Sequence, residues 1–151
     1  MTRIMTYKER LATEQRAVLL SIYSSIVLSI LAECESMSTT KLLFLSFLCK
    51  PSFVNMKGII SPCQKRNLLS HATGIVSGKF EQLKRELPYI VDALVLLVKS
   101  GCVNDTGDAY TLTPRGKELS TPFENAFFKR LAAEVITLDD AFVALEVIRN
   151  V

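Results

Sequence analysis

The amino-acid sequence predicts a mainly α-helical chain that carries one β-hairpin. Apolar residues dominate three helix-length segments, at 17–32, 40–49 and 89–98. Gly101 follows the third segment, and the turn residues at 105–108 then separate two short runs that favour strand. Thr113 and Pro114 come next, where an N-cap and a first helical residue are preferred. The region therefore predicts a helix, a hairpin and another helix in succession.

This succession is typical of the closing half of a winged-helix domain. The expected strands are 102–104 and 109–112, and the helix after them is 114–119. We predict a mainly α winged-helix domain with a two-stranded β-wing and additional N- and C-terminal helices. One domain of 151 residues is expected to hold a polar arm (1–16), an apolar helical pair (17–50), the winged-helix core (64–120) and C-terminal helices (121–151).

Residues that cap, end or weaken helices predict the boundaries of the elements in the first half of the chain. Thr13 is expected to begin a long helix that runs to about Cys34, after a loose polar start. The residues 35–38 are expected to form a break, from which Ser38 or Thr39 caps a second helix over 40–49. A connection over 51–62 and a helix over 64–77 are expected to follow, although glycine and threonine weaken the latter.

The second half of the chain follows the same kinds of signal. An amphipathic stretch covers 80–86, and Pro88 is expected to end or kink it before an apolar helix over 88–100. After the wing, Thr121 and Pro122 predict the start of a helix over 123–135. The last predicted helix covers 138–149, with its cap at Thr137 and two aspartates in its first turn.

The helix before the wing indicates contact with protein. Its only charged side chains are Asp92 and Lys99, whereas a helix that reads DNA needs polar groups for bases and cations for phosphates. The apolar share of 49% and the mean hydropathy of +0.28 also indicate more apolar surface than one small domain hides. The residues expected to contact partners are Ile22, Ile26, Leu43, Phe47, Tyr89 and Leu96.

Basic residues around the wing offer a possible surface for nucleic-acid phosphates. The candidates are Lys79, Lys84, Arg85, Arg115 and Lys117, with Lys65 and Arg66 nearby in sequence. An ordinary solvated face explains them better, because the net charge is only +3. The wing tip, with Asp105 and Asp108, is acidic and unfavourable for contact with a DNA backbone.

No motif in the sequence predicts catalysis, a cofactor or a metal. The chain has no phosphate-binding loop, zinc-protease motif or nucleophile elbow. The cysteines Cys34, Cys49, Cys63 and Cys102 lack zinc-site spacing, and the eight residues from Cys63 to His71 follow no catalytic motif. Acidic residues at a helix start explain Asp139 and Asp140. We expect a non-enzymatic, cytoplasmic protein with reduced thiols, because no apolar signal sequence is present.

The segment LVLLVKSGCVNDTGDAYTLTPRGKEL (94–119) resembles the wing of small prokaryotic winged-helix proteins, in which Y-x-L-T-x-x-G is common. The wider layout resembles the small middle component of ABC-type three-component systems, which include Lamassu anti-phage defence. Its features are a long apolar first helix, an apolar second helix broken at Pro51, and a winged helix followed by terminal helices. The resemblance implies a non-catalytic subunit that bridges an SMC-like ABC ATPase and an effector nuclease, with DNA contact secondary.

Two alternatives remain open at this point. A small winged-helix transcriptional regulator, dimeric through its first and last helices, would bind duplex DNA tightly and by sequence. A membrane-anchored protein would use residues 17–32, although this run is shorter than a typical span and holds four serines.

Overall fold

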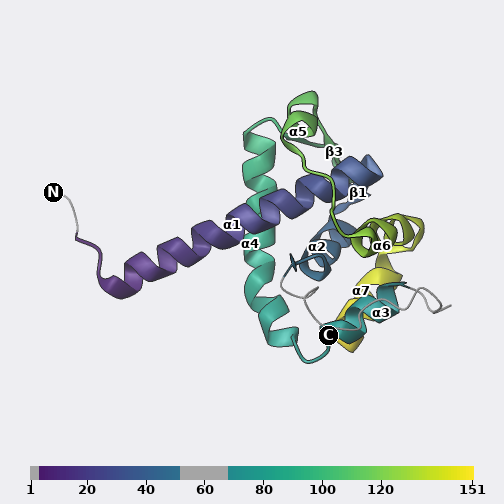
Figure 1. Ribbon diagram of the computed structural model, residues 1–151, viewed down its shortest axis with the longest axis horizontal. Coiled ribbons are helices and arrows are strands. Elements are labelled where there is room, and N and C mark those ends of the chain that lie inside the picture. The colour runs from purple at the N-terminus through teal and green to yellow at the C-terminus, as the bar shows by residue number, and fades with distance from the viewer. Residues whose placement is uncertain (1–3, 52–67) are drawn as a thin grey trace.

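The computed structural model describes residues 4–51 and 68–151 (Figure 1). These residues form a mainly helical molecule with a small antiparallel sheet. Its elements in chain order are α1 (Tyr7–Cys34), β1 (Ser36–Ser38), α2 (Thr39–Leu48), α3 (Leu68–Ile75), α4 (Phe80–Lys99), β2 (Val103–Asp105), β3 (Ala109–Leu112), α5 (Pro114–Leu119), α6 (Ala126–Thr137) and α7 (Asp140–Asn150).

The sheet has three strands in the order β1-β3-β2, one more than the sequence predicts. The predicted hairpin is confirmed, with β2 and β3 paired antiparallel from Val103 opposite Leu112. The third strand, β1, comes from the segment predicted to be a break, and Met37 pairs with Tyr110 of β3. Met37 is buried, so this short segment is fixed by core packing and by a pairing partner some seventy residues away in the sequence.

The first helix begins earlier than predicted, at Tyr7 instead of Thr13. Thr6 is its N-cap, and the side chains of Thr6 and Glu9 satisfy each other's backbone N–H groups in a capping box. Thr13 lies inside the helix, where its hydroxyl donates to the carbonyl oxygen of Glu9. The polar start of the chain from residue 7 onward is therefore helical.

Helix α4 runs unbroken through Pro88, so the predicted division into two helices at this residue is wrong. Residues on both sides of Pro88, including Leu83, Ile90 and Leu94, are buried in the same core. This shared burial offsets the missing backbone hydrogen bond at the proline, whose ring lies on the exposed side of the helix. Figure 1 shows α4 crossing α1 at a steep angle.

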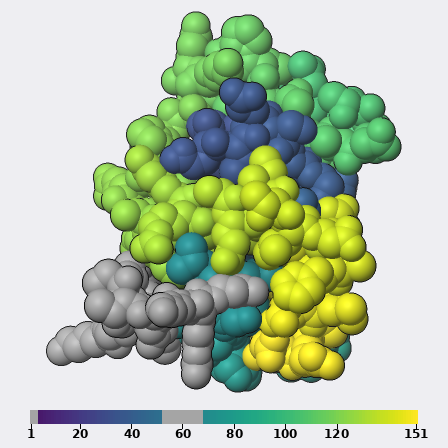
Figure 2. Space-filling model, turned by 90° about the vertical axis from the view of Figure 1, so that its right-hand side faces the viewer, coloured from purple at the N-terminus to yellow at the C-terminus, as the bar shows by residue number. Residues whose placement is uncertain are grey.

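Both C-terminal helices begin a few residues later than predicted. Helix α6 starts at Ala126, because the Asn125 side chain accepts a 2.8 Å hydrogen bond from the Phe127 N–H. Helix α7 starts at Asp140 with Asp139 at the N-cap. Figure 2 shows these two helices beside the β1–α2 segment, and Ser38 donates a 2.8 Å hydrogen bond to Asp140 across that contact.

The core lies where α1, α2, α3, α4, α6 and α7 meet. Its largest fully buried side chains include Tyr23, Phe47, Ile30, Leu42, Leu45, Leu69, Ile90 and Leu131. The second half of α1 and nearly all of α2 contribute to this core. Two of the three strongly apolar segments are therefore used largely inside the chain.

Candidate functional site

The outer face of α4 is the main exposed apolar surface next to the hairpin. One side of this helix packs into the core, and the opposite side leaves Val91, Val95 and Leu96 exposed at 43%, 46% and 51%. This helix thus carries apolar residues on both its buried side and its exposed side, as its sequence predicts. We use "outer face of α4" for these three residues.

The predicted partner-contacting residues occupy different environments. Leu96 is exposed, whereas Ile22, Leu43 and Tyr89 are half-buried and pack against the core. Ile26 and Phe47 are buried inside the chain, so their assignment to a partner interface is corrected to the core. The reason is that α1 and α2 are apolar on faces that their own neighbours cover.

Two other exposed apolar strips lie outside the residues predicted to contact partners. One lies on the first turns of α1, with Tyr7, Leu11 and Val18. The other lies on α7, with Phe142, Leu145 and Ile148. Their spacing of three, four or seven residues is the sequence signal of one helix face. It was missed because polar residues stand among them, so that they form no helix-length apolar run.

The five predicted phosphate-contacting residues do not form one surface. Lys79, Lys84 and Arg85 lie at the beginning of α4, whereas Arg115 and Lys117 lie on α5 beyond the other end of that helix (Figure 1). A 20-residue helix is about 30 Å long, and this length separates the two groups. All five are exposed, and Lys84 lies 3.7 Å from Glu81 and over the Phe80 ring.

The tip of the hairpin presents carboxylates to solvent. Asp105 accepts a 2.9 Å hydrogen bond from the Gly107 N–H, and Thr106 bonds to Ala109 across the turn. Asp105 and Asp108 are both exposed. The tip therefore adds negative charge where a DNA-binding wing needs donors for phosphates.

Two thiols of the described residues, those of Cys34 and Cys49, are unsuited to nucleophilic attack. Cys49 and Cys102 are buried, and Cys34 is partly buried. Burial, aided by the nearby Glu33 carboxylate, raises the pKa of Cys34 to about 11, and burial also raises the pKa of Cys49. A thiol attacks as its thiolate, which these pKa values disfavour at neutral pH.

His71, Asp139 and Asp140, which were considered for catalysis or metal binding, have structural roles in the fold. His71 packs edge-on against the Phe127 ring at 5.8 Å, while Cys63 lies outside the described residues. Asp140 accepts a hydrogen bond from Ser38 and lies 3.8 Å from the Lys41 ammonium, and Asp139 occupies the N-cap position of α7 without a side-chain capping hydrogen bond. Within residues 4–51 and 68–151, no three histidine, cysteine or acidic side chains gather as metal ligands would.

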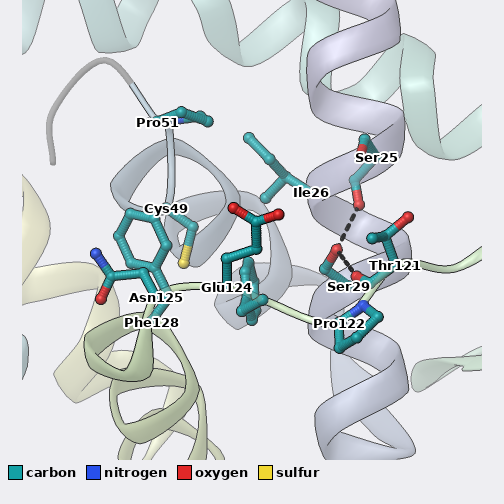
Figure 3. A pocket seen from close by; sticks show the side chains of 11 residues that line it. Ser25, Ile26, Ser29, Cys49, Pro51, Thr121, Pro122, Glu124, Asn125 and Phe128 are labelled. Atoms are coloured by element: carbon teal, nitrogen blue, oxygen red, sulfur yellow. Dashed lines mark hydrogen bonds between the residues drawn. The ribbon is translucent and has the colours of Figure 1, made fainter. Parts of the chain in front are cut away.

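A cavity of about 380 Å³ opens between α1, the end of α2 and the segment before α6 (Figure 3). Its lining is mainly apolar, with Ile26, Cys49, Pro122 and Phe128 among the contributors. The Ser29 hydroxyl shares its one proton between the backbone carbonyl oxygens of Ser25 and Thr121, and this links α1 to the segment before α6 at the cavity wall. Among the residues that the structure describes, the lining holds a neutral thiol and one acidic residue, Glu124, and no histidine or lysine that would act as a base or counter-charge.

Helix α1 is the one described helix that is long and apolar enough to cross a membrane. Its apolar half carries Tyr23 and most of the residues from Ile26 to Leu31 into the core. The folded chain packs this half against its own helices.

Comparison with protein-family models, with curated proteins and with solved structures finds no match, so the function has to be inferred from the residues themselves.

Proposed function

We propose that this chain is a non-catalytic adaptor that binds a partner protein through the outer face of α4. One observation carries the proposal: Val91 and Val95, one turn apart, are exposed on the helix that precedes the hairpin, and Leu96 is exposed about 100° further round that helix. Neighbouring exposed apolar side chains are costly in water and mark surfaces that another protein covers.

The arrangement of elements supports a winged-helix reading of this adaptor. The strand order β1-β3-β2 and the position of α4 directly before the β2–β3 hairpin are what that fold requires. In it, the helix before the wing is the element that meets the ligand. Here that helix offers valine and leucine on the middle and end of its outer side, which suits an apolar protein surface better than base edges.

The resemblance in sequence layout gives the partners. We propose that they are an SMC-like ABC ATPase and an effector nuclease in the cytoplasm, with ATP hydrolysis and strand cleavage carried by those chains. Any contact with DNA inside the complex would be secondary, through Lys79, Lys84 and Arg85 at one end of α4 or Arg115 and Lys117 on α5. Such contact would weaken steeply as salt rises.

The proposal is tested by sequencing the neighbouring genes for an SMC-like ATPase and a nuclease and by co-expressing these two proteins with the chain. We expect the three proteins to elute together in size-exclusion chromatography. Val95→Glu and Leu96→Glu should abolish co-elution, because each places a charge in an apolar contact. Leu145→Glu on the exposed face of α7 is the matched control and should leave the complex intact.

Two results would contradict the adaptor. One is a chain that never co-elutes with either partner or whose co-elution is unaffected by Val95→Glu and Leu96→Glu. The other is tight, sequence-dependent binding of duplex DNA by the isolated chain, which would favour a transcriptional regulator instead.

A further inference from the structure

We infer that two copies of this chain pair antiparallel through the first three turns of α1, residues 7–18, here called the N-terminal arm. Figure 1 shows this part of α1 projecting away from the other helices. The ion pair between Arg16 and Asp92, at 3.2 Å, ties α1 to α4 near the base of the arm. Before this point only the part of α4 around Arg85 and Tyr89, among the described residues, lies near the arm, and every arm residue except Glu9 is exposed.

An arm of this length gains little stability from its own backbone. Isolated helices shorter than about 12–15 residues are marginal in water, and most helical stability in proteins comes from packing an apolar face. The capping box at Thr6 and Glu9 fixes only the start. Leu11 and Val18 nevertheless expose 42% and 58% of their surface on the arm. A partner that covers these residues would supply the missing packing.

A groove runs along the arm where it meets α4. It measures about 740 Å³, and its lining residues are Leu11, Glu14, Gln15, Val18 and Leu19 of α1 with Arg85, Glu86 and Tyr89 of α4. Leu11, Glu14 and Val18 are three and four positions apart, so they share one side of the helix. The lining thus combines apolar side chains with two carboxylates, those of Glu14 and Glu86, and one guanidinium, that of Arg85.

The charges of the arm make a second copy the fitting occupant. With Leu11 of the two copies at a twofold axis, helical geometry of 100° per residue brings Glu14 of one copy beside Tyr7 and Arg10 of the other. Neither Arg10 nor Glu14 forms an ion pair with another residue of the described chain. The symmetry makes the contact occur twice, once on each side of the axis.

Sedimentation velocity of the full chain over a range of concentrations tests this pairing. We expect a reversible dimer for the wild type. Leu11→Glu should raise the dimer dissociation constant at least about tenfold, because it places two carboxylates at the axis. Leu145→Glu on α7 is the control, because this leucine is even more exposed than Leu11 (68% against 42%), and it should not change the constant. Leu11 is exposed in the single chain, and circular dichroism should show that both variants stay folded.

A charge-mixing experiment tests the antiparallel register. Arg10→Glu alone and Glu14→Arg alone should each weaken the dimer, because like charges then meet on both sides of the axis. An equimolar mixture should form a heterodimer at least about tenfold tighter than either homodimer, since both cross-copy pairs become opposite in charge. Helix propensity within each chain is unchanged by mixing, so only contact between copies produces this result.

A wild-type chain that stays monomeric at all concentrations would overturn the inference and leave the arm to another protein. A dimer that tolerates Leu11→Glu, or a mixture that forms no preferred heterodimer, would also overturn it. The proposed adaptor role is tested separately, because Val95→Glu and Leu96→Glu on α4 leave the arm untouched.

Discussion

The ammonium of Lys50 lies 2.7 Å from Oε1 of Glu86, the same oxygen that accepts a 2.6 Å hydrogen bond from the Tyr23 hydroxyl. Glu86 is only 4% exposed, so the pair lies almost out of water. Glu86 lies on α4 and Tyr23 lies on α1, whereas Lys50 directly follows the C-cap residue of α2. One buried carboxylate thus ties together the helices that build the core.

Removal of Lys50 should destabilise the chain strongly. Lys50→Ala leaves the Glu86 carboxylate buried without its cation, which typically costs about 3–5 kcal/mol. Lys50→Ala combined with Glu86→Gln should be less destabilised than Lys50→Ala alone, because no charge is then stranded. Unfolding in urea measures both free energies of unfolding.

An exposed ion pair provides the control for this prediction. Lys84→Ala removes the contact with Glu81, which lies in solvent, and should change stability by less than about 0.5 kcal/mol. Equal losses of unfolding free energy in Lys50→Ala and Lys84→Ala would show that burial does not set the strength of the Lys50–Glu86 pair.

The same cluster should shape the dependence of stability on pH. Burial raises the pKa of Glu86, but hydrogen bonds from Lys50 and Tyr23 outweigh it, so the pKa lies below its usual value. A lowered pKa in the folded state adds stability above the unfolded pKa, and this stability is lost as pH falls through the folded pKa. Glu86→Gln should flatten the acid limb of a plot of unfolding free energy against pH.

The alkaline limb has a different origin in this cluster. Burial, together with the neighbouring Glu86, raises the pKa of Tyr23 above its usual value. The folded state then holds the phenolic proton more tightly, so stability is lost as pH rises past about 10, the usual pKa of tyrosine. Tyr23→Phe should reduce this alkaline loss, and a wild-type chain whose stability is flat above that pH would contradict the assignment.

Local chemistry explains which elements the sequence could predict. Thr113 accepts from the Gly116 N–H as an N-cap, and Gly101 and Gly107 take the left-handed backbone that a helix end and a tight turn need. These signals lie within a few residues of the structure they cause. The hairpin and α5 were accordingly predicted almost residue for residue.

Long-range packing explains what the sequence could not predict. Strand β1 exists because Met37 pairs with Tyr110, and α4 continues unbroken through Pro88 because both of its halves pack on one core. The same limit applies to the candidate site. A helix that is apolar on every side does not reveal which side its own fold covers, so Ile26 and Phe47 could not be told from Leu96 by composition.

A close backbone approach makes Gly116 a sensitive position. An added Cβ at Gly116 would lie 2.1 Å from the Cys102 carbonyl oxygen, a backbone atom that cannot move aside cheaply. Gly116→Ala should therefore destabilise by about 1–3 kcal/mol and separate α5 from the hairpin. The measurement is the urea midpoint.

Gly74 in α3 is the matched control for Gly116. No atom lies within 4 Å of a Cβ built there. Gly74→Ala should stabilise by roughly 0.5–1 kcal/mol, because alanine is the better helix former. If both variants changed the free energy of unfolding in the same direction, the close contact with the Cys102 carbonyl would not be the reason that residue 116 is a glycine.

Replacement of Pro88 by alanine should stabilise the chain. Proline inside a helix removes one backbone hydrogen bond and crowds the preceding turn, at a cost of about 3 kcal/mol in an exposed helix interior. The Pro88 ring is exposed, so Pro88→Ala opens no cavity in the core and lets residue 88 bond to the carbonyl of Lys84. We expect a gain of about 1–3 kcal/mol in the free energy of unfolding in urea. Val91→Ala, one turn later on the exposed side, should change it by less than about 0.5 kcal/mol. A loss of stability in Pro88→Ala would instead mean that α4 needs the local bend of a proline for Leu83 and Leu94 to reach the same core.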